Sequence, residues 1–145
     1  MTLNQLVDHI QNLGEKHNQI KKTFWGNLVD FLALDNLYPA LNYDLNGANI
    51  TGAQLTVNFA LFFMDRILPD QSNALDVLSD QVLIAQDIIA QLRYPGNDFE
   101  INDNVQMTFF VDDTGDSLAG VRCDISINLG YISDRCQVPS DITYA

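Results

Sequence analysis

Asp112, Thr114 and Asp116 stand at the alternate spacing of the oxygen ligands in a calcium-binding loop. An EF-hand also requires a glycine at the sixth position of that loop and a bidentate glutamate at the twelfth. Here a serine and a cysteine occupy these positions, so the sequence excludes an EF-hand. A looser cation site among Asp112, Asp113 and Asp116 is the alternative to a solvated acidic turn. We expect the turn, with no bound metal.

The histidines and cysteines do not form a ligand set either. His9 and His17 lie on a stretch that is expected to be helical, but they lack the His-Glu-x-x-His pattern and a third ligand. We expect two ordinary histidines on a helix surface. Cys123 and Cys136 fit neither a disulfide framework nor a four-ligand zinc site. Cys123 falls on the apolar side of a strand pattern, which is typical of a reduced core residue.

The sequence carries none of the short motifs that mark nucleotide binding or nucleophilic catalysis. It has no P-loop, no Gly-x-Gly-x-x-Gly and no Gly-x-Ser-x-Gly. Carboxylates are plentiful, but nothing singles out a pair for acid–base chemistry. We therefore predict a protein that is not an enzyme and uses no cofactor.

Composition and charge narrow the possible partners. The 145 residues, 47% of them hydrophobic, lie within the size range of one domain, which we expect to span 1–145. The net charge of −12 opposes binding to nucleic-acid phosphates or to an anionic membrane. The N-terminal residues lack the pattern of a secretory signal, and the apolar stretch 55–64 is too short and too polar to span a bilayer. We expect a protein that stays in the cytosol in which it is made.

Two segments have the three-to-four spacing of amphipathic helices. One extends from about residue 3 to 22. The other extends from about residue 73 to 93, and its width indicates a helix that lies across a sheet rather than half of a coiled coil. We expect one row of its residues to pack on that sheet: Leu75, Leu78, Val82, Ala85, Ile89 and Leu92.

The remaining segments alternate as strands do. Residues 41–63 predict a hairpin with a long polar loop at 46–52, and residues 105–111 and 121–131 predict two final strands. Residues 23–37 predict a short strand or an irregular segment. The tail 134–145 predicts an extended arm or disorder. Together these segments predict an α+β fold, with an antiparallel or mixed β-sheet packed by two α-helices.

The polar connection between the last two strands is longer than a tight hairpin needs. Loops without catalytic residues often contact a neighbouring molecule. We therefore expect this loop and the C-terminal tail to form a subunit interface, made by Asp112, Asp113, Thr114, Asp116, Ser117, Gln137, Val138 and Pro139.

The order of these segments resembles that of the tail terminator, tail completion and neck ring proteins of tailed bacteriophages. The resemblance lies in the helix at 3–20, the approach from Phe24-Trp25-Gly26 to Tyr38-Pro39, the helix at 73–93 and the hairpin at 105–131, which together span most of the chain. It implies a non-enzymatic virion protein, made in the host cytoplasm, that forms a sixfold or twelvefold ring. Such a ring binds neighbouring tail, connector or portal proteins, and DNA passes through it without sequence-specific binding. It assigns no role to an individual residue.

The acidity suits a DNA channel, because negative walls repel the phosphates and let the duplex slide. The pattern also resembles the secretion chaperones, small acidic proteins that dimerise and bind an effector segment. A ring needs two different complementary faces per subunit, whereas a chaperone dimer uses one self-complementary face. A small hydrolase would require a compact carboxylate or histidine cluster in a pocket.

Overall fold

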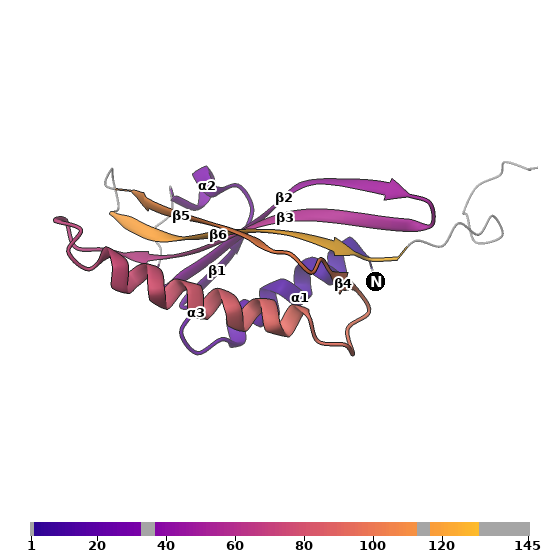
Figure 1. The fold of residues 1–145 in the computed structure, drawn as a ribbon, viewed down its shortest axis with the longest axis horizontal. Coiled ribbons are helices and arrows are strands. Elements are labelled where there is room, and N and C mark those ends of the chain that lie inside the picture. Colours follow the sequence, from indigo (N-terminus) through magenta and orange to yellow (C-terminus); the bar gives the residue numbers. More distant parts are fainter. Residues whose placement is uncertain (1, 33–36, 113–116, 131–145) are drawn as a thin grey trace, which may run out of the picture.

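The computed structural model describes residues 2–32, 37–112 and 117–130. These residues form a curled mixed β-sheet with helices against it, as Figure 1 shows, which confirms the predicted α+β class. In chain order the elements are α1 (Leu3–Lys16), β1 (Lys22–Trp25), α2 (Leu28–Leu32), β2 (Ala40–Thr51), β3 (Gln54–Arg66), α3 (Ala74–Leu92), β4 (Glu100–Ile101), β5 (Gln106–Asp112) and β6 (Leu118–Asn128).

The strand order in the sheet is β1-β2-β3-β6, and both β4 and β5 pair with the outer edge of β6. All pairs are antiparallel except β1 with β2, which is parallel. Helices α1 and α3 cover one face, where the main core lies, and the short α2 covers a second, smaller core on the other face. The sheet is therefore mixed, and a third helix joins the two that the sequence predicted.

Helix α1 is shorter than the spacing of its apolar residues predicted. A capping box between Thr2 and Gln5 starts it, and it ends at Lys16 rather than near residue 22. Ile20 is buried, as the helical pattern required, but it lies in the turn that leads into β1. Its place in the three-to-four series therefore reflects burial rather than helical structure.

The β2–β3 hairpin corrects a second expectation. Residues 46–51, which we expected in a loop, continue β2 past a bulge between Leu45 and Gly47, and Thr51 pairs directly with Gln54. Gly52 forms the tight turn with a φ of +59°. The polar sequence therefore belongs to the second half of a long strand, and this half is exposed on both faces. The last two strands were predicted at nearly the observed positions. β6 begins at Leu118 rather than at residue 121, and it ends at Asn128 rather than at residue 131.

Helix α3 occupies the predicted range but turns a different side toward the sheet. Ala85, Ile89 and Leu92 are buried as expected, whereas Leu75 is 78% exposed and Leu78 is only partly buried. The core instead receives three residues of the neighbouring row, Val77, Ile84 and Ile88. The apolar stripe is wide enough for both rows, and the sheet covers only part of it. Of the helices in the described ranges, none is long and apolar enough to cross a membrane.

Candidate functional site

Of the predicted interface residues, the structure describes Asp112 and Ser117. Asp113, Thr114, Asp116, Gln137, Val138 and Pro139 lie outside the described residues. Asp112 is the last residue of β5, and Ser117 has a left-handed φ of 53° just before β6. The backbone N–H of Ile67 donates a hydrogen bond of 2.8 Å to the carbonyl of Ser117, which ties this end of the sheet to the start of the connection to α3. The interface role of the loop and tail stays a prediction.

The two histidines have separate surroundings and are less exposed than expected. His17 follows α1, and its Nε2 lies 2.9 Å from Oδ2 of Asp87 on α3. His9 packs edge-on against Phe99 with 5.4 Å between ring centroids, and burial lowers its pKa. Both side chains therefore help to pack the fold rather than lie free on a helix surface. No group of three or more histidine, cysteine or acidic residues within the described ranges could hold a metal ion.

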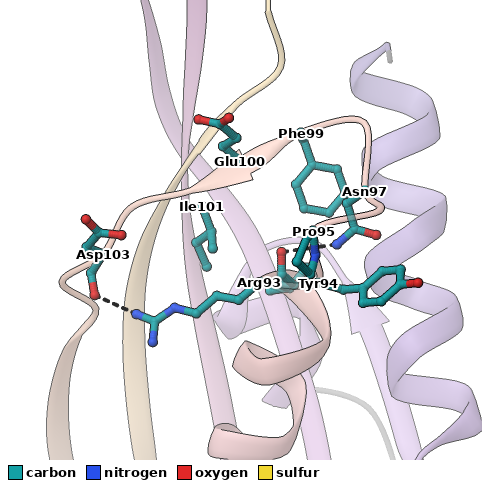
Figure 2. Close-up of a pocket in the computed structure, with 9 residues that line it drawn as sticks. Arg93, Tyr94, Pro95, Asn97, Phe99, Glu100, Ile101 and Asp103 are labelled. Atoms are coloured by element: carbon teal, nitrogen blue, oxygen red, sulfur yellow. Dashed lines mark hydrogen bonds between the residues drawn. The ribbon is translucent and has the colours of Figure 1, made fainter.

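A polar hollow of about 460 Å³ lies where the chain leaves α3 and enters β4 (Figure 2). Arg93 donates a hydrogen bond of 2.6 Å to the backbone carbonyl of Asp103, and Tyr94 points to the opposite side. The side-chain amide of Asn97 donates to the carbonyls of Gln91 and Leu92 at 3.1 and 3.2 Å. These bonds satisfy carbonyl groups that every helix end leaves without a partner. No histidine, serine or cysteine lines the hollow, and its acidic lining residues are Glu100 and Asp103.

A second hollow, of about 330 Å³, is apolar and lies beside α2 on the other face of the sheet. Arg122 stands at its wall, with its guanidinium carbon 5.5 Å from the ring centre of Phe62 and its Nε 3.0 Å from Oδ1 of Asp124. The hollow could accept one apolar side chain. It is lined by Leu28, Leu32, Phe62, Met64, Thr108, Phe110, Leu118 and Arg122.

Strand β5 forms an open edge of the sheet. Among the described strands it pairs only with β6, so the hydrogen-bonding groups along its outer side have no strand partner. Phe109 is 57% exposed and Val111 is 43% exposed. Residues 104–111 carry no charge and no proline, although charges and prolines are the usual means of protecting an edge strand from pairing.

The exposed side chains of β5 extend an apolar surface from α3. Phe109 and Val111 are the cross-strand partners of Val121 and Ala119, which are buried on the face that α3 covers. Helical spacing places Leu75, Leu78 and Val82 on the side of α3 that carries Ile89, and Ile89 lines a hollow with Met107. We name this surface the β5–α3 patch, and it consists of Leu75, Leu78, Val82, Met107, Phe109 and Val111.

The far end of the β2–β3 hairpin projects from the opposite edge of the sheet. Residues 46–54 are all exposed, and Figure 1 shows the pair of strands extending beyond β6 and α3. The run 45–64 is the longest in the sequence without an acidic or basic residue, and within it Ile50 is 60% exposed. We name residues 46–54 the arm.

Sequence reasoning missed both surfaces, although it predicted the strand at 105–111 and a hairpin over 41–63. The signal that was available is the absence of charge over 45–64 and 104–111 in a chain with a net charge of −12. A scan against models of protein families and a search of curated proteins found no match to this sequence.

Proposed function

We propose that the chain is a non-enzymatic structural protein of a tailed-bacteriophage virion, which assembles as a ring at the tail end or neck and leaves a channel for DNA. The observation that carries this proposal is the open edge of β5, which is uncharged from Gln106 to Val111 and has Phe109 and Val111 exposed beside it. Such an edge readily pairs with another chain. A protein that stays monomeric gains nothing from it.

The arrangement of the elements supports the proposed class of protein. The helix, the hairpin, the second helix and the final hairpin follow one another in the order that resembles tail terminator and neck ring proteins, and α1 and α3 lie together on one face of the sheet. The exposed side of α3 carries Asp76, Asp80 and Asp87, and the helix has no lysine or arginine. This helix layer suits a channel wall that repels DNA.

The second candidate is the secretion-type chaperone dimer, and the apolar hollow beside α2 favours it. Its lining would accept an apolar side chain of an extended effector segment, with Arg122 at the wall to attract an acidic neighbour. A chaperone would use one self-complementary face, whereas a ring uses two different faces.

Light scattering after size-exclusion chromatography, followed by electron microscopy, tests the proposal. A ring has a mass about six or twelve times the 16.2 kDa of the subunit, and it appears closed in projection. Because each subunit carries −12, assembly should strengthen as salt rises toward physiological levels. A dimer of constant mass would instead support the chaperone. A protein that stays monomeric at high concentration and does not bind to purified tails or capsids would refute the structural role.

A further inference from the structure

We infer that the arm of one copy lies on the β5–α3 patch of the next copy, so that the outer edge of β2 pairs with the outer edge of β5 across the subunit boundary. This inference rests on the proposed function, because it requires self-assembly. It specifies the two surfaces that meet and their arrangement. The contact is head-to-tail, with the arm and the patch as the two complementary faces.

The first argument is the hydrogen-bonding capacity of the two edges. β5 presents an outer edge over Gln106–Asp112. β1 pairs with β2 only from Ala40 to Tyr43, so the outer edge of β2 beyond that point has no strand partner within the described ranges. Each edge therefore offers backbone donors and acceptors to a strand from outside. Pairing them would continue the sheet from one copy into the next.

The second argument is position. β2 and β5 lie at opposite edges of the sheet, with β3 and β6 between them. The arm of a copy therefore cannot cover the patch of the same copy. When unlike faces of identical subunits meet, each added subunit leaves one arm and one patch free. Assembly therefore ends only when the row of subunits closes on itself.

The third argument is charge and chemistry. Two copies that each carry −12 repel one another wherever their acidic residues approach. The arm and β5 as far as Val111 avoid this repulsion, because residues 45–64 and 104–111 carry no charge. Ile50 on the arm and Phe109, Val111 and Leu75 in the patch are exposed apolar side chains on both sides of the contact. Their burial would favour association.

The test uses one aspartate variant for each face of the full-length protein. Ile50→Asp alters the arm, and Phe109→Asp alters the patch. Leu75→Asp is a second patch variant, because Leu75 lies on the surface of α3 and its replacement leaves the sheet intact. The matched control is Leu83→Asp on α3, which is 56% exposed and lies outside the patch. Circular dichroism verifies that each variant is folded, and light scattering gives its mass.

We expect the wild type and Leu83→Asp to assemble, and the arm variant and both patch variants to remain monomeric. An equal mixture of Ile50→Asp and Phe109→Asp should then give dimers and nothing larger, because each variant retains the face that the other has lost. This result is specific to a head-to-tail contact.

Three outcomes would overturn the inference and leave the proposed ring in place. If the arm and patch variants assemble like the wild type, other surfaces form the contact and the proposed ring still stands. If the mixture forms no dimer, the arm and the patch are not partners. If a chain that ends at residue 130 is monomeric while Ile50→Asp assembles, the C-terminal segment covers the patch instead. A wild type that is monomeric at every concentration would refute the ring proposal together with the inference, which separates that failure from the others.

Discussion

Replacing Gly120 by alanine should destabilise the protein, because this glycine lies where two neighbouring strands leave no room for a side chain. In β6 it stands opposite Met64 of β3 on one side and Phe110 of β5 on the other. A Cβ atom at this position would overlap the carbonyl oxygen of Phe63 and would lie 2.9 Å from both Cα of Met64 and Cζ of Phe110. The Phe110 ring can rotate away, but the backbone of β3 cannot.

The size of the effect follows from two opposing contributions. Overpacking of a tight site typically costs about 1–3 kcal/mol. Alanine restricts the unfolded chain more than glycine does, which restores about 0.4–1 kcal/mol. We therefore expect a net loss of roughly 1–2 kcal/mol in the free energy of unfolding at Gly120. For a chain of this length this corresponds to a fall in Tm of roughly 2–8 °C.

Urea unfolding followed by circular dichroism measures this loss, and Gly47→Ala is the matched control. Gly47 also lies in a strand, but a Cβ there would meet no atom within 4 Å. Its variant should unfold within about 0.5 kcal/mol of the wild type. An unchanged midpoint for Gly120→Ala would mean that β3 and β6 do not meet in the register described. An equal loss in both variants would point to the removal of glycine rather than to the clash.

Three further outcomes are expected. On α3, Ile88→Ala should lower the free energy of unfolding by about 2–5 kcal/mol because Ile88 is buried. Leu83 is exposed, so Leu83→Ala should change it by less than about 0.5 kcal/mol. Similar urea midpoints for the two variants would contradict the burial pattern. Burial lowers the pKa of His9 below 6.5. The unfolded chain therefore binds this proton more readily than the folded chain does, and the free energy of unfolding falls as pH drops through and below 6.5. His9→Gln should lose less stability than the wild type between pH 7 and 5, and parallel losses would exclude this contribution. Burial raises the pKa of the Cys123 thiol to about 12. In a Cys136→Ser variant a thiol reagent should therefore react with Cys123 only after urea unfolds the protein. Immediate labelling would show that Cys123 is accessible in the folded protein.

The periodic elements could be predicted from the sequence because their patterns record burial. The alternation in β3 and β6 gave the correct faces, and the spacing along α3 gave the correct range. The side that α3 turns toward the sheet could not be chosen, because Leu75 and Val77 belong to adjacent rows of one wide apolar stripe. Only the position of the sheet decides that Val77 is buried and Leu75 is exposed.

The candidate assembly surfaces could not be predicted because they depend on pairing between strands. The arm has no alternation, since a hairpin exposed on both faces has no reason to separate apolar from polar residues. Its residues therefore resembled a loop. The open edge of β5 is likewise invisible in the sequence of β5 itself, because it results from the strand order that puts β3 on the other side of β6.

The distribution of charge shows how so acidic a subunit could assemble with copies of itself. The acidic residues of α3 are exposed on the helix layer, whereas the two sheet edges that we propose as contacts carry none over 45–64 and 104–111. Repulsion between neighbours would then act mainly between the helix layers. Physiological salt largely screens charges that lie more than about 8 Å apart. In the proposed ring the edges can bind tightly while the helix layer keeps its negative charge for the channel. A subunit whose acidic residues were spread evenly could not combine these two properties, because each contact would bury like charges together.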